Sequence, residues 1–145
     1  MEQVLEITTD KNRINLEFVH SYLSNTSYWA KGRSLEDVRL SIANSLCFSL
    51  FCKTSNSQIG FARVATDYVV FAWIMDVFVA DEFKGKGYGK MLVNQILNHP
   101  DLQNVNGFGL RTSDAHGLYR QFGFTKIPDP ETWMFKKNKN INRKY

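Results

Sequence analysis

Residues 74–96 read IMDVFVADEFKGKGYGKMLVNQI, the stretch that decides the fold. Residues 74–79 are apolar apart from Asp76 and rich in β-branched and aromatic side chains, which predicts a strand. Glycines at alternate positions follow, and beyond them apolar residues recur at helical spacing as far as His99 and Pro100. The face that this helix is predicted to bury consists of Tyr88, Met91, Leu92, Gln95 and Ile96.

The glycine-rich turn between strand and helix is predicted to bind an anion, usually a phosphate. A helix start presents unpaired N–H groups and the positive end of the helix dipole, and Lys84 and Lys86 add positive charge. The turn is not a Walker A loop, because Gly89 and Lys90 are followed by Met91 instead of Ser or Thr. Its G-x-G-x-G spacing also fits the dinucleotide fingerprint poorly.

Two segments resemble motifs of the GNAT superfamily of N-acyltransferases, and the chain looks like a small bacterial-type member. Residues 84–89, KGKGYG, resemble the family's Q/R-x-x-G-x-G/A acyl-CoA loop, with Lys84 where Arg or Gln is usual. Residues 114–124, DAHGLYRQFGF, resemble its A-x-x-L-Y-x-x-x-G-F segment, and residues 76–79 look like its fourth strand. The resemblance covers roughly residues 46–135.

The fold class that we expect is α/β (α+β). The resemblance implies a mixed, mostly antiparallel central sheet with a splayed parallel strand pair, flanked by helices on both faces. In that family the two parallel strands separate at their carboxyl ends, and acyl-CoA enters the gap. The strand–helix–strand order of residues 74–112 independently predicts a right-handed crossover with parallel strands.

The other elements are predicted from local patterns. Strands are expected at Val4–Thr8, Leu46–Lys53, Ile59–Thr66, Phe108–Thr112 and Thr132–Lys136. One helix, capped by Asp10 or Asn12, is expected to bury Ile14, Phe18 and Tyr22. A second helix, which starts at Ser34 and Asp37, is expected to bury Leu35, Val38 and Ile42. A short third helix is expected at Ala115–Phe122. We expect a single domain over residues 1–135 and a basic, flexible tail over residues 136–145.

The net charge and the hydropathy of the chain bear on two classes of function, nucleic-acid binding and membrane contact. The 145 residues carry a net charge of +4, but five basic residues and no acid lie in residues 136–145, so the body carries −1. RNA binding through this tail is therefore the less favoured alternative. The longest apolar stretch, Tyr68–Ala80, is too short to span a bilayer, so we expect a cytoplasmic protein without membrane contact.

The two cysteines are expected to be buried thiols. Cys47 and Cys52 fall in one predicted strand with their side chains on opposite faces, so a bond between them would require distortion. No Cys or His cluster has metal-ligand spacing, and no metal is expected.

The resemblance assigns acetyl-CoA, as a co-substrate, to the glycine-rich turn and the strand before it. The diphosphate is expected on the N–H groups of Lys84, Gly85, Lys86, Gly87, Tyr88, Gly89 and Lys90. In the strand segment Val77, Phe78 and Val79, an N–H around Val77 or Phe78 is expected to bind the thioester carbonyl. Such a donor contributes about 3 kcal/mol in other enzymes; the alternative is an N–H paired within the sheet.

Tyr119 matches the residue that usually protonates the leaving thiolate in the family. A phenol with a pKa near 10 can donate to a thiolate whose conjugate acid lies near 8.5. At helical spacing Tyr119 also lies beside Ala115 and Phe122, so a packing role is the alternative.

The general base is not evident. An amine with a pKa of about 10.4 must lose its proton near pH 7, a step of about 4.6 kcal/mol, and where many family members carry a Glu this chain has Met75. Asp76 is an acid in an apolar strand and serves either in catalysis or as a hydrogen-bonded structural carboxylate. Asp67 is expected in a turn, and Asp114 is expected to cap the helix that it precedes.

The acceptor side is the least determined. By resemblance, Tyr28 and Trp29 lie in the segment that covers the acceptor site, although they also fit core packing. His116 is a further candidate for contact with the acceptor, and Arg33 and Arg63 either bind an acceptor carboxylate or form surface ion pairs.

The function that we expect is N-acetyl transfer from acetyl-CoA to a primary amine by direct attack in a ternary complex. The acceptor is a small-molecule or peptide amine, and the chain is a monomer or homodimer. The alternative is an acyl-CoA-binding regulatory module with weakened catalysis, for which Met75 is the main argument.

Overall fold

A five-stranded sheet in the order β1-β2-β3-β4-β5 forms the centre of the computed structural model, which describes residues 3–139, 141 and 143. Neighbouring strands are antiparallel except β4 and β5, which are parallel as predicted. The mixed, mostly antiparallel sheet is therefore confirmed. Its strands are β1 (Leu5–Thr8), β2 (Leu46–Cys52), β3 (Ser57–Thr66), β4 (Phe71–Val79) and β5 (Gly107–Gly109).

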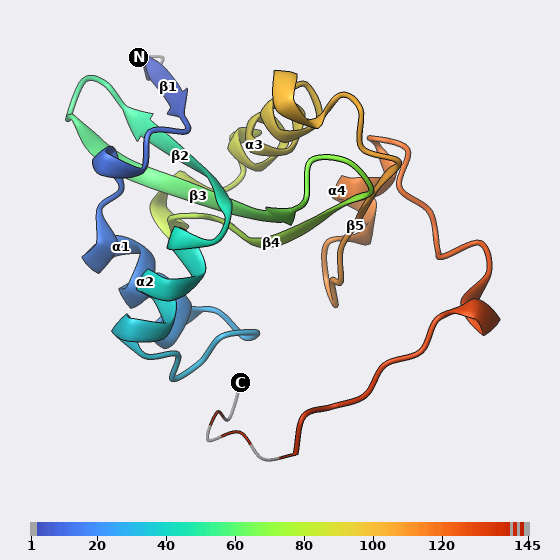
Figure 1. Cartoon of the computed structure of the whole chain (residues 1–145). Helices are drawn as coiled ribbons and strands as arrows, with labels where there is room; N and C mark the ends of the chain where they lie inside the picture. Colours follow the sequence, from blue (N-terminus) through green and yellow to red (C-terminus); the bar gives the residue numbers. More distant parts are fainter. Residues whose placement is uncertain (1–2, 140, 142, 144–145) are drawn as a thin grey trace.

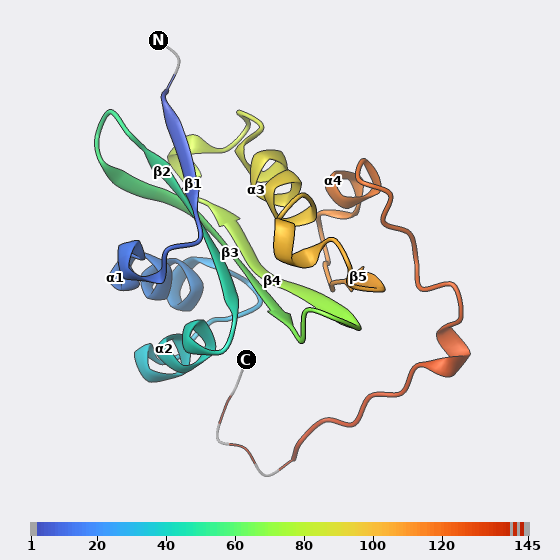
Figure 2. The same cartoon turned by 45° about the horizontal axis from the view of Figure 1, so that its top comes forward.

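Helices cover both faces of this sheet (Figures 1 and 2). On one face lie α1 (Leu16–Ser21), a single turn of π-helix, η2 (Tyr22–Thr26), that continues α1, and α2 (Leu35–Ala43). On the other face lies α3 (Tyr88–Leu97), with α4 (His116–Arg120) near β5. Short 3-10 turns complete the described elements: η1 (Lys11–Arg13), η3 (Asp81–Phe83), η4 (Pro100–Leu102) and η5 (Pro130–Thr132).

Each face of the sheet has its own apolar core. Leu92 and Ile96 of α3 pack on strand residues that include Phe48 and Leu50, whereas the cluster under α1 and α2 is made of Val19, Leu23, Val38, Phe61 and Phe78 among others. Cys52 belongs to the first cluster and Cys47 to the second, and both are free, so the prediction of two buried thiols on opposite faces is confirmed. Burial raises the pKa of the Cys47 thiol to about 11.

The residues that the helices bury differ from the predicted ones, because tertiary contacts decide which side of each helix faces the core. Asn15 caps α1 by accepting from the Phe18 N–H, and Asp10 caps η1 instead. In α3 the buried residues are Leu92, Val93 and Ile96, while Met91 is exposed. The buried residues of the first helical segment are Val19 and Leu23 in place of Ile14, Phe18 and Tyr22, which are partly buried, and Leu35 of α2 is exposed.

A bulge interrupts the pairing of β3 with β4 at Asp76. Phe61 pairs with Phe78 and Arg63 with Met75, so one residue of β3 faces two residues of β4, Asp76 and Val77. Asp76 has φ of +54°, a left-handed conformation that Asp and Asn tolerate better than most residues. The extra residue turns the Asp76 side chain to the face that carries α1 and α2, where alternation alone would point it towards α3.

The parallel strands β4 and β5 pair over only three residues each, from Phe71 opposite Gly107 to Trp73 opposite Gly109. At the end of this pairing Gly109 lies against the ring of Trp73: an ideal Cβ on Gly109 would come within 2.6 Å of Phe71 and 2.8 Å of Trp73. Beyond Trp73 the backbone groups on this edge of β4 have no ladder partner in β5. The predicted separation of the two strands at their carboxyl ends is therefore present.

The prediction of a C-terminal strand at Thr132–Lys136 is wrong. Residues 130–132 form the 3-10 turn η5, and residues 133–139 have no regular secondary structure. Among the described residues, no neighbouring strand lies beside this segment, so its backbone has no ladder to join. The preceding helix, α4, is also shorter than predicted and starts at His116.

In the part of the chain that the structure describes, no helix has the length and apolar character needed to cross a membrane. The structure cannot describe a tail over residues 136–145 as a whole, because residues 140, 142, 144 and 145 lie outside the described part.

Candidate functional site

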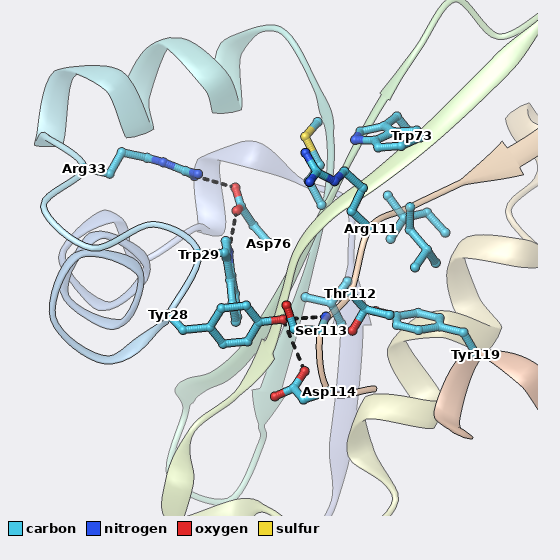
Figure 3. Close-up of a pocket in the computed structure, with 14 residues that line it drawn as sticks. Tyr28, Trp29, Arg33, Trp73, Asp76, Arg111, Thr112, Ser113, Asp114 and Tyr119 are labelled. Carbon is cyan, nitrogen blue, oxygen red and sulfur yellow. Dashed lines mark hydrogen bonds and ion pairs between the residues drawn. The ribbon is translucent and has the colours of Figure 1, made fainter. Parts of the chain in front are cut away.

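A pocket of about 450 Å³ occupies the gap where β4 and β5 separate (Figure 3). Its floor is β4 from Trp73 to Val77. Tyr28, Trp29 and Arg33 line it from the segment between α1 and α2, and the chain that follows β5 lines the opposite side, together with Tyr119 of α4. The pocket therefore unites the predicted acceptor residues Tyr28 and Trp29 with the predicted acid Tyr119.

Asp76 is buried in this pocket wall and is held by three donors. Its Oδ2 accepts from Arg33 Nη1 at 2.7 Å and from Arg63 Nε at 2.9 Å. Its Oδ1 accepts from Trp29 Nε1 at 2.9 Å. Burial alone would raise the pKa of this carboxyl, but the charges and hydrogen bonds of Arg63 and Arg33 outweigh burial and lower the pKa below its ordinary value. Asp76 is thus an ionised carboxylate with both oxygens engaged.

The two arginines are correspondingly inside the fold. The side chains of Arg33 and Arg63 are each only 11% exposed, and Arg63 also donates from Nη1 to Ser45 Oγ at 3.1 Å. The interpretation of these residues as surface ion pairs is wrong, because both are buried and paired with Asp76, whereas binding of an acceptor carboxylate stays a prediction. Through Trp29 and Arg33, the same carboxylate fixes the aromatic segment to the central strand.

A second contact holds the α1–α2 segment to the opposite wall. The Tyr28 hydroxyl donates to Asp114 Oδ1 at 3.2 Å and accepts from the Ser113 N–H at 3.1 Å. Asp114 does not cap α4 as predicted: the Ala115 N–H donates to Thr112 Oγ1 instead, and Asp114 remains an exposed carboxylate in the pocket lining. Tyr28 and Asp114 thus join two sides of the pocket lining (Figure 3).

Tyr119 is buried on α4 and lines the pocket. Its ring packs edge-on against Phe124, with the ring centroids 5.7 Å apart, so it has the packing contact that the sequence also allowed. Burial first, and then the neighbouring Tyr28 and Asp114, raise the pKa of its phenol to about 12. Tyr119 is therefore protonated at neutral pH and is a hydrogen-bond donor.

The glycine-rich turn lies beyond the carboxyl end of β4, between β4 and α3. Gly85 and Gly87 have φ of +79° and +82°, which a residue with a side chain adopts only under strain. Among the described residues, none accepts a hydrogen bond from the N–H groups of residues 85–90; the first amide of α3 with a partner is Met91, which donates to the Gly87 carbonyl. The turn thus presents a row of unpaired amides at the start of a helix.

Two lysines beside this turn differ in their surroundings. Lys84 pairs with Asp81 at 2.7 Å and lies 5.9 Å from the centre of the Tyr22 ring, and these groups raise its pKa. Tyr22 in turn stacks on Phe78, with the ring centroids 4.0 Å apart. Lys86 lies 5.8 Å from the centre of the Phe83 ring. The side chain of Phe78 belongs to the core, so any contact with a ligand is left to its backbone.

Comparison with known proteins decides the family. The family model described as "Acetyltransferase (GNAT) domain" matches residues 45–126. The uncharacterized N-acetyltransferase ycf52 of Porphyra purpurea is 31% identical over 144 residues, which cover 87% of this chain and 82% of that protein. A crystal structure from Xanthomonas campestris pv. campestris, described as a candidate acetyltransferase of the GNAT family, is 40% identical with a TM-score of 0.89, over 95% of this chain and 96% of that one.

The chain belongs to the GNAT family of acetyltransferases. Another GNAT-fold structure, from Clostridium acetobutylicum, was crystallised with acetyl-CoA; at 14% identity and a TM-score of 0.63, over 94% of this chain and 96% of that one, it shows the fold alone.

Not every predicted site residue of this GNAT chain reaches the pocket. His116 is exposed at the start of α4 and lines a separate groove instead. Within the described residues, no three Cys, His, Asp or Glu side chains are placed to hold a metal ion.

Sequence reasoning missed Trp73, Arg111, Thr112 and Ser113, which all line the pocket. Arg111 and Thr112 lie at the carboxyl end of the predicted strand Phe108–Thr112 and Ser113 directly follows it, so their position at this end of the parallel pair was the available signal.

Proposed function

We propose that this GNAT acetyltransferase transfers the acetyl group of acetyl-CoA to a primary amine by direct attack in a ternary complex. The observation that carries the proposal is the row of unpaired amides at residues 85–90. They follow the carboxyl end of β4, and the gap between β4 and β5 is lined by Tyr119 and by the aromatic residues Tyr28, Trp29 and Trp73. A diphosphate on these amides would receive hydrogen bonds and the field of the α3 dipole, with Lys86 and Lys90 adding charge.

The thioester would then lie along the free edge of β4. Beyond Trp73 this edge has no ladder partner in β5, so N–H groups of the segment Val77–Val79 are candidates for the oxyanion donor. An N–H in that position stabilises the charge that develops on the carbonyl oxygen and lowers the activation free energy by about 3 kcal/mol.

Tyr119 would stabilise the departing sulfur. With a phenol pKa of about 12 and a thiol pKa near 8.5, full proton transfer is uphill by about 3.5 units, or about 5 kcal/mol. We therefore assign to Tyr119 a hydrogen bond to the developing thiolate, with the final proton coming from solvent. The effect needs the hydroxyl but no ionisation of Tyr119.

The amine proton requires a different acceptor. In the described pocket lining the carboxylates are Asp76, with both oxygens engaged, and Asp114. We propose that Asp114 accepts the proton through water, because it is exposed and, among the described residues, accepts a hydrogen bond only from Tyr28. The predicted catalytic role of Asp76 stays a prediction, and in this proposal its carboxylate positions Trp29 at the acceptor side.

The remaining expectations stay part of the proposal. The acceptor is a small-molecule or peptide amine, the domain comprises residues 1–135 with a basic tail at 136–145, and the location is cytoplasmic. Nucleic acid is not proposed as a partner.

The test combines binding and turnover. A panel of amines is incubated with protein and acetyl-CoA, release of free CoA thiol is followed, and the melting temperature is measured with and without acetyl-CoA. We expect a rise in melting temperature and thiol release with at least one amine. Tyr119→Phe should lose most turnover but keep the thermal shift, whereas Tyr68→Phe, at a turn remote from the pocket lining, should keep both.

Two results would contradict the proposal. Absence of any thermal shift would remove acetyl-CoA as the donor. A thermal shift without thiol release across the amine panel would favour the regulatory acyl-CoA-binding module, for which Met75 in the pocket floor is the structural argument.

A further inference from the structure

The pocket lining contains two arginines, Arg33 and Arg111, and the fold uses them differently. Arg33 is held by Asp76 at 2.7 Å. Arg111 is exposed, and among the described residues its guanidinium has no ion pair, hydrogen bond or aromatic ring as a partner. Because an arginine keeps its charge at any pH that a folded protein survives, Arg111 is a permanent cation in the pocket lining.

Arg111 lies level with the middle of β4, well before the glycine-rich turn. The pairing of β5 with β4 ends at Gly109 opposite Trp73, so two residues later Arg111 is level with Met75. From Met75 the strand runs on to Val79 before the turn begins, a span of roughly 13 Å at the usual rise per residue. The charge of Arg111 is therefore placed for a ligand in the pocket and not for a diphosphate on the turn.

A group of opposite charge lies three residues further along the same segment. Asp114 is exposed and lines the same pocket, and we assigned the amine proton to its carboxylate. The Cα atoms of Arg111 and Asp114 are at most about 11 Å apart, since three residues of chain reach no further. In the view of Figure 3, Arg111 and Trp73 are drawn above, and Tyr28 and Asp114 below. One small molecule can therefore contact both charges.

We propose that the acceptor is an amino acid, a primary amine that also carries a carboxylate, with the carboxylate on Arg111 and the amine on the side of Asp114. This assignment rests on the proposed function, because the same reaction defines the acceptor. The planar fork of a guanidinium matches the two oxygens of a carboxylate. As the C–N bond forms, the C–S bond of the thioester breaks, which yields an N-acetyl amino acid and the thiol of CoA.

The charges of the lining favour a carboxylate over a phosphate. One arginine balances the single charge of a carboxylate, whereas a phosphate monoester carries between one and two negative charges at neutral pH. The additional charge would be repelled by Asp114 in the same lining. Between the two charged groups, Trp29, Trp73 and Leu110 offer apolar contact to the carbon skeleton of an amino acid.

Kinetics with matched amines test the inference. Phenylalanine is compared with phenethylamine, and γ-aminobutyrate with propylamine, so that each pair differs by one carboxylate. O-phosphoethanolamine and ethanolamine form the phosphate pair. Release of CoA thiol gives kcat/KM, referred to the neutral amine because the members of a pair differ in amine pKa. We expect the carboxylated member of at least one pair to be preferred by 10-fold or more, and no such preference in the phosphate pair.

Variants of Arg111 locate this preference. Arg111→Met should raise the KM for the preferred amino acid by about 10- to 100-fold. It should leave the kcat/KM of the partner amine and the thermal shift with acetyl-CoA unchanged. Arg111→Lys, which keeps the charge without the fork, should fall between wild type and Arg111→Met, and it carries the test if the methionine variant does not fold. Arg39→Met, at an exposed arginine of α2 outside the pocket lining, is the matched control and should behave as wild type.

The outcomes separate this inference from the proposed function. Equal kcat/KM values within both carboxylate pairs, or an Arg111→Met variant that keeps the preference, would overturn the inference and leave the proposed function standing. A preference confined to O-phosphoethanolamine would overturn the carboxylate as the ligand. If no amine releases thiol, the proposed function itself fails, and the assignment of the acceptor fails with it.

Discussion

Replacing Asp76 by Asn should destabilise the fold strongly, because this carboxylate neutralises two buried arginines. Asn keeps the shape of the side chain and tolerates the φ of +54°, so the substitution removes mainly the charge. Arg33 and Arg63, each with only 11% of the side chain exposed, then lack their shared counter-ion. Breaking a buried ion pair from one side costs about 3–5 kcal/mol. At about 3 °C per kcal/mol for a chain of this size, the melting temperature should fall by roughly 9–15 °C.

Urea unfolding followed by tryptophan fluorescence measures this loss. Asp81→Asn is the matched control, because it removes an ion pair with Lys84 whose partners are more than half exposed, and such pairs contribute less than about 1 kcal/mol. A free energy of unfolding for Asp76→Asn within 1 kcal/mol of the control would refute the reasoning. Such a result would mean that the ion pairs do not hold the bulge of β4.

Three further outcomes follow from single positions. Because folding lowers the pKa of Asp76, its contribution to the free energy of unfolding is fully present above the unfolded pKa near 3.8 and is lost as the pH falls through the lower folded pKa. The difference in unfolding free energy between wild type and Asp76→Asn, measured from pH 7 to 2, should therefore shrink only in that acid range. In Gly87→Ala the free turn should leave the left-handed conformation, and restoring it on binding costs about 1–2 kcal/mol, so the calorimetric Kd for acetyl-CoA should rise by about 5- to 30-fold. Gly117→Ala, at a glycine without a positive φ, should leave the Kd unchanged. Gly109→Ala forces a methyl against Trp73 and should lower the unfolding free energy by about 1–3 kcal/mol; an unchanged urea midpoint would show that the rings move aside freely.

The strand, the glycine-rich turn and the helix of residues 74–97 could be predicted because their signals are local. The apolar run, the glycine spacing and the helical repeat each depend on residues adjacent in sequence, and β4, the turn and α3 all occur where expected. Within the turn, Gly85 and Gly87 have left-handed conformations. The parallel pairing of β4 and β5 also follows from a general rule for strands joined by a helix.

The partners of Asp76 could not be predicted, because they come from distant parts of the chain. Arg63 lies 13 residues away across a bulge, and Arg33 lies 43 residues away in another layer. Nothing in the local pattern marks the bulge that turns Asp76 towards them. A buried acid with two arginines is therefore visible only once the layers are assembled.

The two errors near the C-terminus have a similar origin. A helix cap by Asp114 was a sound local prediction, but Thr112 supplies the acceptor and leaves Asp114 to Tyr28, which is 86 residues away. The apolar pattern of residues 132–136 has the chemistry of a strand, yet a strand forms only where a neighbouring backbone is available. In the part of the chain that the structure describes, no strand lies beside that point.

The central claim, that the unpaired amides of the glycine-rich turn bind the diphosphate of acetyl-CoA, is tested most directly by ¹H–¹⁵N correlation spectra during titration. The amide signals of Gly85, Gly87 and Gly89 should shift with acetyl-CoA and with CoA, and should not shift with S-acetyl-pantetheine, which lacks the diphosphate. Saturable shifts elsewhere in the spectrum, with these three signals unmoved by acetyl-CoA, would contradict the account.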